Sequence, residues 1–405
     1  MAIRVKKISI NGALKKSLIK VLRLIFLIYS KIIFKMKVRC LFFVLIFFLL
    51  ACVVHNNFPL FPEIKRASDL ANKRGLPLAN PFEIGEDVKK EVASKINQNQ
   101  IQYLRLKEIF DFLCQNDRVN FNYNLQENLT SQETYEKRKG NCISYTGLFV
   151  SIARELRIPV YFAHLNDIVD FEEKDGSYIA SSHIAAGFND GERTLLVDFL
   201  REKERENYQF YEKIDDLTAY CLFYNNVAVV DILEGKYEEA QKILDFLLSL
   251  KPSLNELLNN RGVLYLKKGE YEKALQMFDK IRLKKIGYQP AFHNGLLTSK
   301  ILKNEFYERL FAEELKKYSN NDPVLLYERS MELAKQGKLA EAINLIKKAI
   351  SEKPRSAFLY ASLSVLYVKN GDLIKAKDLF KKAQKISPNL YLLGDIVAEY
   401  PQLQR

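Results

Sequence analysis

Three patterns of apolar and polar residues divide the chain into regions with different structural expectations. Residues 41–51, LFFVLIFFLLA, form an unbroken apolar run without a charge. Residues 85–210 combine apolar stripes at helical spacing with short strand-like runs, so helices followed by strands are expected there. Residues 221–390 carry apolar positions at helical spacing throughout, which predicts an all-α region.

The middle region, residues 85–210, has a helical half and a strand-rich half. We predict helices at 86–98, 101–115 and 142–156, and strands at 160–165, 182–188 and 193–199. Thr130 and Glu133 form a capping-box pattern that opens a further short helix. That helix should end at Lys139-Gly140, because Gly readily adopts the left-handed conformation. The acidic, Gly-containing run 166–177 is predicted to be a loop.

The C-terminal region repeats with a period of 34 residues. Glycines, alanines and prolines recur at steps of 34 or its multiples: Gly235, Gly269, Gly337 and Gly371; Ala240, Ala274, Ala342 and Ala376; Pro252, Pro354 and Pro388. This period, with Gly in a turn, Ala where two helices touch and Pro after the second helix, is the tetratricopeptide signature. The predicted repeats are 221–254, 255–288, 289–322, 323–356 and 357–390.

The third repeat is degenerate, because Asn304 and Phe306 arrive one residue late and the Ala is missing. Residues 391–405 are expected to cap the stack, since a terminal repeat must cover its apolar face. A solenoid of this kind usually presents a concave surface to a protein or peptide partner. A spacer or an oligomerisation module is the alternative, and both remain open.

A candidate hairpin brings a histidine and an aspartate together. The two strands at 182–188 and 193–199 flank Asn189-Asp190-Gly191-Glu192, and a central Asp-Gly predicts a two-residue type I′ turn. In that register the numbers of paired residues add up to 381, so His183 lies directly opposite Asp198. The carboxylate can then accept a hydrogen bond from one imidazole nitrogen and leave the other nitrogen free.

Cys142 is the candidate nucleophile for this pair. It stands in the first turn of the predicted helix 142–156, where the partial positive charge of the helix N-terminus favours a thiolate. Cys142, His183 and Asp198 would then be a nucleophile, its base and the carboxylate that orients the base. Taken singly, each has an ordinary structural interpretation, as a core Cys, a satisfied His or a solvated Asp. One Cys and one His do not make a metal-ligand set, and no cofactor is predicted.

Here the chain resembles the core of bacterial transglutaminase-like proteins. The residues that carry the resemblance are Arg138-Lys139-Gly140-Asn141-Cys142, Ser144-Tyr145-Thr146, Leu148-Phe149 and Ala153-Arg154-Glu155-Leu156. The resemblance implies an α+β, papain-like fold with a Cys helix packed on an antiparallel sheet. It also implies thiol acyl chemistry on amides, with Cys142 as nucleophile, His183 as base and Asp198 as orienting acid. Candidates for a side-chain oxyanion donor are Asn120, Asn122 and Asn124.

The net charge of +13 is unevenly distributed. Residues 1–40 hold eleven basic residues and no acidic residue, and the first acidic residue is Glu63. The rest of the chain carries only +2, so nucleic acid is not an expected partner. The five cysteines are too few for a disulfide scaffold, and no two of them stand at CxxC spacing.

The basic lead and the apolar run together indicate an export signal. The run 41–51 follows a basic segment that begins at Met36, and it is too short for a membrane span of about 20 residues. Leu49-Leu50-Ala51-Cys52 resembles the lipobox of bacterial lipoproteins, which implies that Cys52 is lipidated and becomes the first residue of the mature chain. An uncleaved signal anchor through residues 40–62 is the alternative. Met1 and Met36 are both candidate start residues.

We therefore expect residues 1–51 to be a basic lead and signal peptide, and residues 52–84, with four prolines, to be a tether. The chain should be exported and membrane-anchored, on the periplasmic face, at the outer membrane or at the cell surface. Two functions stay open. One is a thiol enzyme, a cysteine peptidase, an amidase or a protein-glutamine acyltransferase, whose repeats recruit a protein or peptide. The other is a catalytically inactive scaffold and binding module for envelope assembly.

Overall fold

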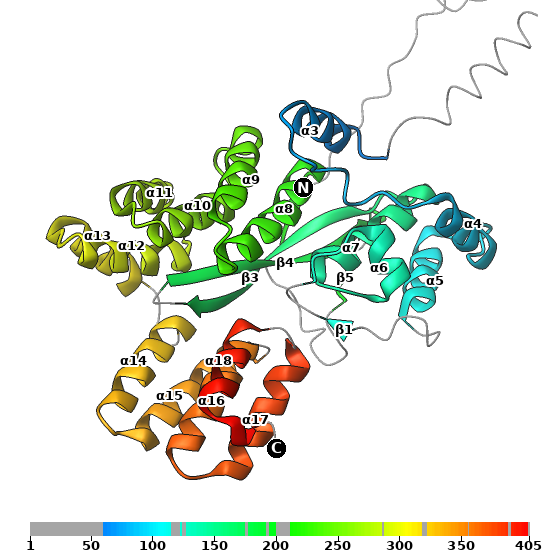
Figure 1. Ribbon diagram of the computed structural model, residues 1–405. Coiled ribbons are helices and arrows are strands. Elements are labelled where there is room, and N and C mark those ends of the chain that lie inside the picture. Colours follow the sequence, from blue (N-terminus) through cyan, green and yellow to red (C-terminus); the bar gives the residue numbers. More distant parts are fainter. Residues whose placement is uncertain are drawn as a thin grey trace, which may run out of the picture. The chain divides into compact units, whose positions relative to one another are not determined.

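A computed structural model describes most of the chain after the predicted signal peptide (Figure 1). It describes residues 60–403 apart from 115–121, 124–126, 175–176, 192–193, 200–210, 286, 318–321, 355 and 388–389. The predicted signal peptide and lipobox, including Cys52, lie outside the described residues. None of the helices in the described ranges is both long and apolar enough to cross a membrane.

The first described segment is folded, so the tether predicted for residues 52–84 is wrong from residue 60 onward. Helix α3 (Pro62–Lys73) has Pro at its start, where the missing N–H costs nothing, and it buries Ile64 and Ala67. Phe82, only 1% exposed, packs its ring against three other aromatic rings of the core. The prolines that suggested a linker are separated by apolar residues that join this core.

Four further helices precede the main sheet: α4 (Glu86–Lys95), α5 (Gln102–Cys114), α6 (Ser131–Lys137) and α7 (Cys142–Glu155). The capping box is confirmed, because the Thr130 side chain accepts from the Glu133 N–H and the Glu133 carboxylate accepts from the Thr130 N–H. The predicted left-handed Gly after α6 is wrong in detail. Arg138 takes that conformation, with φ 54°, and Gly140 has φ 154°.

The main sheet has four antiparallel strands in the order β5-β4-β3-β6. The strands are β3 (Tyr161–Lys174), β4 (Ser177–Asn189), β5 (Thr194–Val197) and β6 (Tyr211–Ile214). The loop predicted at 166–177 is wrong, because β3 continues to Lys174 and pairs with β4 along almost its whole length. Acidic local composition suggested a loop, but main-chain pairing with β4 decided the conformation.

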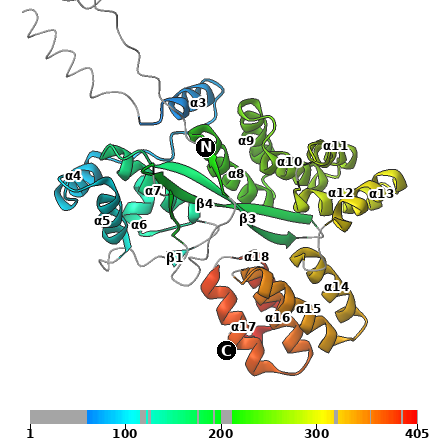
Figure 2. The ribbon, with the colours of Figure 1, turned by 180° about the vertical axis from the view of Figure 1, so that it is seen from behind.

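Helix α7 is the central helix of this domain. Every residue from Cys142 to Ala153 is buried, and the Thr146 hydroxyl donates to the Ile184 carbonyl of β4 at 3.0 Å. Figure 2 shows α7 beside β4 from behind. A Cβ on Gly147 would overlap the Phe82 ring, so this glycine allows the N-terminal segment to pack closely on α7. The α+β domain followed by an all-α solenoid confirms the predicted fold class.

Ten helices form five antiparallel pairs, which match the predicted repeats except that the first pair begins at Asp216 rather than at residue 221. They are α8 (Asp216–Leu233) and α9 (Tyr237–Leu250); α10 (Asn255–Lys267) and α11 (Tyr271–Leu283); α12 (Gln289–Ile301) and α13 (Glu305–Lys316); α14 (Pro323–Lys335) and α15 (Leu339–Glu352); α16 (Ala357–Lys369) and α17 (Leu373–Ile386). Helix α18 (Tyr391–Glu399) and a 3₁₀ turn (Pro401–Leu403) follow, and they pack on α16 and α17.

The third repeat is irregular in its residues rather than in its helix positions. Helices α12 and α13 begin 34 residues after α10 and α11, so the predicted one-residue delay is absent. In the other four repeats a Gly with φ near 80° joins the two helices. In the third repeat Lys303 takes this position with φ 52°. Helix pairing therefore keeps the 34-residue period even where the glycine is lost.

The solenoid is interrupted after the third repeat. Helix α9 packs against α10, α11 against α12 and α15 against α16, but the described parts of α13 and α14 lack an equivalent packing. Two apolar clusters result. One unites the α+β domain with the first three repeats, and the other consists of repeats four and five, the C-terminal helix and Tyr178 of β4.

Candidate active site

Cys142 is the first residue of α7, and it is 7% exposed. The preceding residue, Asn141, caps the helix by accepting a hydrogen bond from the Ser144 N–H at 3.0 Å. The Asn141 amide also donates to the Asn128 side chain at 2.9 Å, so the cap is anchored to the rest of the domain. These bonds place the Cys142 thiol at a defined helix N-terminus, where anionic sulfur is stabilised.

The backbone conformation at Gly140 gives a physical reason for the glycine in the Arg138–Cys142 motif. Its φ of 154° lies in a region that residues with a side chain rarely adopt. A Cβ at this position would also meet the Ser144 Cβ at 2.7 Å. A glycine therefore lets the chain turn into the Cys142 helix without backbone strain or overlap with Ser144.

The strand before Cys142 is paired with one of the candidate oxyanion segments. β1 (Asn122–Tyr123) runs parallel to β2 (Lys139–Gly140), with Asn122 opposite Lys139. Of the three candidate donors, Asn122 thus has its backbone beside the segment that leads into α7. Asn120 and Asn124 lie outside the described residues.

His183 lies in β4 beside an irregularity of the sheet. Leu165 of β3 pairs with His183, but the next pair is Val169 with Ser182, so β3 contains three extra residues at this point. Insertions of this kind bend a strand and are common next to active sites, where they change the direction of a side chain. The His183 side chain is 4% exposed.

The structure brings His183 and Asp198 together, but not in the predicted register. The β4–β5 pairs run from Asn189–Thr194 to Ala186–Val197, so their numbers add up to 383 rather than 381. The two-residue type I′ turn is therefore wrong, because the last pair before the turn is Asn189 with Thr194. Asp198 follows the last paired residue of β5, and the register continued by one residue sets it opposite Ala185.

His183 and Asp198 are still hydrogen-bonded because the observed register differs from the predicted one by two residues, an even number. A shift of two residues keeps a side chain on the same face of a sheet, whereas a shift of one would move it to the other face. Diagonal neighbours remain close enough for long side chains to meet. The His183 Nε2 lies 2.8 Å from the Asp198 Oδ1, and Asp198 has 12% of its side chain exposed.

The environment of His183 favours the imidazolium. Burial has the largest effect on the pKa of His183 and lowers it, because a charged ring is costly away from water. Hydrogen bonds with Asp198 and Cys142, together with the negative charges of these partners, outweigh burial and raise the pKa to about 10. With Nε2 bonded to Asp198, Nδ1 is the nitrogen that remains for the Cys142 thiol.

Two other histidines have acidic neighbours that the sequence did not indicate. The His164 Nε2 lies 3.6 Å from the Glu256 carboxylate of α10, and His293 of α12 lies 3.5 Å from Glu328. Both acids come from helices far along the chain, so no local pattern could have revealed them. Within the described ranges, no three His, Cys, Asp or Glu side chains are grouped so that they could hold a metal ion.

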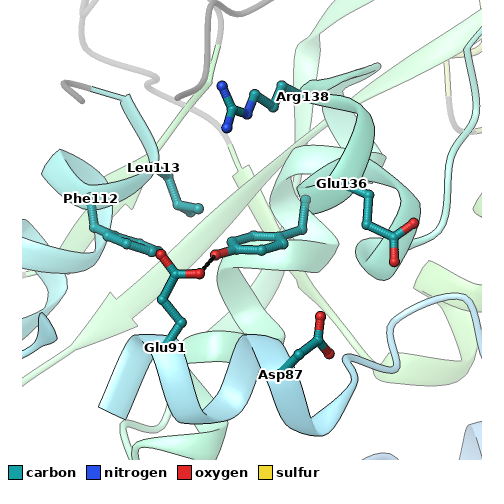
Figure 3. Close-up of a pocket in the computed structure, with 7 residues that line it drawn as sticks. Asp87, Glu91, Phe112, Leu113, Glu136 and Arg138 are labelled. Carbon is teal, nitrogen blue, oxygen red and sulfur yellow. Dashed lines mark hydrogen bonds between the residues drawn. The ribbon is translucent and has the colours of Figure 1, made fainter. Parts of the chain in front are cut away.

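A cavity of about 190 Å³ lies between α4, α5 and α6 (Figure 3). Its walls combine acidic side chains with aromatic rings, and the Tyr135 hydroxyl donates to Glu91. Figure 3 shows Arg138 across the cavity from Asp87. None of the three candidate catalytic residues lines it. The cavity adjoins the Cys142 motif only through Arg138, so it is not the candidate thiol site.

Comparison with known families agrees with this architecture. A family model described as the transglutaminase-like superfamily matches residues 90–170, and two models described as tetratricopeptide repeats match 234–286 and 359–390. The first match includes Cys142 and ends before His183 and Asp198. The chain thus contains a transglutaminase-like core domain and tetratricopeptide repeats, a combination that supports a protein-binding module.

Two individual proteins that the chain resembles are described as tetratricopeptide repeat proteins. The chain is 26% identical over 188 residues to the TPR repeat-containing protein YpiA and 21% identical over 198 residues to YvcD, both of Bacillus subtilis (strain 168). These matches cover 46% and 41% of this chain, and they span only 42% and 41% of the relatives' lengths.

Similar solved structures are also repeat proteins. A tetratricopeptide repeat protein from Parabacteroides merdae ATCC 43184 is 24% identical with a TM-score of 0.34, and the match covers 47% of this chain and 75% of that one. YrrB, described as a TPR protein with an unusual peptide-binding site, is 22% identical with a TM-score of 0.24 over 44% of this chain and 92% of its own.

Proposed function

We propose that this protein is a thiol enzyme of the transglutaminase-like class that acts on peptide or side-chain amides. The observation that supports it most directly is the hydrogen bond of 2.8 Å between the His183 Nε2 and the Asp198 Oδ1, on an imidazole that also contacts the Cys142 thiol. A nucleophile, a base and an orienting carboxylate with these contacts are the parts of a cysteine triad.

The chemistry follows from the three roles. The Cys142 sulfur attacks the amide carbonyl, and the C–N bond breaks as His183 gives a proton to the departing amine. The acyl group is then held as a thioester on Cys142. Attack by water releases a carboxylic acid, whereas attack by an amine forms a new amide. Asp198 keeps the imidazole oriented through both steps.

The test is the site-specific alkylation rate of Cys142 with iodoacetamide at pH 6, measured by mass spectrometry on the full-length chain. An activated thiol reacts faster than free glutathione, and His183→Gln should remove the difference. Cys221 is an internal control, since burial raises the pKa of its thiol to about 12 and keeps it protonated. A Cys142 rate equal to that of glutathione contradicts the proposal.

A binding and assembly module without catalysis is the second candidate. The observation that favours it is the closure of the thiol site, where Cys142 and His183 are 7% and 4% exposed. In this case the repeats recruit a protein or peptide, and the transglutaminase-like domain is a scaffold. Cys142→Ala would then restore the phenotype of a deletion strain as fully as the wild type does.

We further propose export and lipid anchoring through Cys52, on the basis of the lipobox-like Leu49-Leu50-Ala51-Cys52. The structure describes the chain from residue 60 onward. Eight residues reach at most roughly 28 Å, so the thiol domain would lie close to the membrane surface. Metabolic labelling with radioactive palmitate should label the wild type and leave Cys52→Ser unlabelled. Equal labelling of both proteins contradicts the lipid anchor at this residue.

A further inference from the structure

The outer half of the β3–β4 hairpin, residues 169–174 and 177–182, lies beyond the change of register and is bound by the repeats. Asn294 of α12 is fully buried, and its side chain makes two hydrogen bonds with the main chain of Tyr178 in β4. Its Oδ1 accepts from the Tyr178 N–H at 2.7 Å, and its Nδ2 donates to the Tyr178 carbonyl at 2.7 Å. A paired strand makes the same two bonds to a residue opposite it, so Asn294 recognises extended backbone.

A row of buried asparagines orients the Asn294 side chain. The Asn294 Nδ2 also donates to Asn259 at 3.1 Å, Asn259 donates to Asn260 at 3.1 Å, and Asn260 donates to Asn225 at 3.0 Å. These residues come from the first helices of three successive repeats, α8, α10 and α12, and each is at most 2% exposed. A connected buried network of this kind holds its members in one arrangement, because any other leaves polar groups without partners.

Tyr178 connects α12 of the third repeat with α14 of the fourth. Its ring is 4% exposed and lies 5.3 Å from the His293 ring, and its hydroxyl donates to Glu328 of α14 at 2.9 Å. Tyr178 packs in the apolar cluster of repeats four and five, whereas the next residue, Ile179, packs in the cluster of the α+β domain and the first three repeats. Successive side chains of one strand therefore join the two parts of the solenoid.

The same strand carries the candidate base. His183 follows Tyr178 by five residues, about 17 Å along a strand. Between them the hairpin stays paired with β3, and the change of register beside His183 separates the outer half from the domain sheet. The repeats hold the outer half of the hairpin, and the domain sheet holds the inner half. His183 therefore lies where these two fixed segments meet.

We propose that Asn294 and Tyr178 are positioning residues for the thiol site: the repeats bind the hairpin as an internal extended ligand and thereby hold the strand that presents His183 to Cys142. This inference rests on the proposed function. It also means that the hydrogen-bonding groups of the Asn294 side chain are already used by the hairpin of the same chain. A peptide partner that used the same asparagine would have to displace the hairpin, and would thereby alter the thiol site.

The experiment compares the full-length wild type with Asn294→Ala. Hydrogen–deuterium exchange reports whether Ser177–Ser182 is held, and NMR titration of His183 reports the thiol site without requiring activity. We expect at least tenfold faster exchange of this segment and a lower His183 pKa. The Cys142 alkylation rate at pH 6 should fall at least fivefold. Because the His183 titration depends on its contacts with Asp198 and Cys142, a merely structural role for Asn294 would leave it unchanged.

Two further variants separate the outcomes. Ser299→Ala on the same helix removes a buried hydroxyl that donates only to its own helix at Gly295, and it should leave all three measurements unchanged. Tyr178→Phe keeps the ring and loses the bond to Glu328, so it should fold and show smaller changes in the same directions, whether or not Asn294→Ala folds. Unchanged exchange, or faster exchange with an unchanged His183 titration, overturns the inference. If the wild-type Cys142 reacts like glutathione, the proposed function is overturned. The hydrogen–deuterium exchange and the His183 titration then still decide whether Asn294 and Tyr178 position the strand.

Discussion

The Nε2 of His183 and the Oδ1 of Asp198 lie 2.8 Å apart although the two residues do not face each other across the β4–β5 pair. They are diagonal neighbours on one face of the sheet. Asp198 directly follows Val197, the last residue of β5 in its pairing with β4. A carboxylate in this place can turn toward the imidazole, which supports its proposed role as the group that orients the base.

Replacing Asp198 by Asn should weaken the activation of Cys142. The neutral amide no longer stabilises the imidazolium, so the pKa of His183 falls and the imidazole supports the Cys142 sulfur less well. We expect the alkylation rate of Cys142 at pH 6 to fall by about tenfold, a change of about 1.4 kcal/mol. Asp378→Asn, on the exposed face of α17, makes the same change in charge and should have no effect. Equal rates for Asp198→Asn and wild type would exclude the carboxylate from the site's chemistry.

The stability contributed by His183 should decrease at alkaline pH. Its pKa is raised from 6.5 to about 10, so the folded protein holds a proton that the unfolded chain releases between these values. The contribution is therefore complete below about pH 6.5 and is lost as the pH rises through about 10. Urea unfolding of wild type and His183→Gln from pH 6 to 10 measures it. The difference in unfolding free energy should shrink with rising pH, and a constant or growing difference contradicts this assignment.

Gly140→Ala should destabilise the fold through two separate effects. A Cβ is strained at φ 154° and also meets the Ser144 Cβ at 2.7 Å. Backbone strain of about 1–2 kcal/mol and overpacking of about 1–3 kcal/mol predict a loss of roughly 2–5 kcal/mol in urea unfolding. Gly75→Ala has a similar left-handed strain, at φ 73°, but no atom within 4 Å. It should lose only about 1 kcal/mol, and equal losses would show that the contact with Ser144 is unimportant.

Lys303→Gly should stabilise the third repeat. Lys303 has φ 52°, at the position where the other repeats have glycine, and a left-handed residue with a side chain costs about 1 kcal/mol. Glycine loses more conformational entropy on folding than lysine does, which reduces the net gain. We therefore expect the free energy of unfolding in urea to rise by roughly 0.5 kcal/mol. Lys335→Gly, in the last turn of α14, should have the opposite sign. Destabilisation by Lys303→Gly would show that its side chain makes a contact worth more than the strain.

Much of the secondary structure could be predicted because its causes are local. The 34-residue period gave five helix pairs, since helix packing recurs wherever the same apolar spacing recurs. The Thr130–Glu133 capping box and the start of α7 at Cys142 depend on residues three or four positions apart. The predicted tether is wrong because its four prolines alternate with Phe61, Ile64 and Phe82, whose burial depends on distant segments such as helix α7 and strand β3.

The site was partly predictable for a related reason. The pairing of His183 with Asp198 needed only the correct face of the sheet, and face alternates with a period of two, so an even error in register did no harm. The contacts of Asn294 with Tyr178 had no local signal, because 116 residues separate the two. The same holds for residues 169–174 of the predicted loop, whose strand conformation depends on pairing with β4.

The sequence by itself determined the order of the regions, the helical repeat period, the thiol-bearing helix start and the candidate His and Asp. These properties arise from side chains a few residues apart, or from a fixed structural period. Only the tertiary structure decided the register of β4 and β5, the folding of residues 60–84 and the binding of the hairpin by the repeats. These depend on main-chain and side-chain groups that are distant in the chain, whose hydrogen bonds and burial exist only after the whole domain has folded.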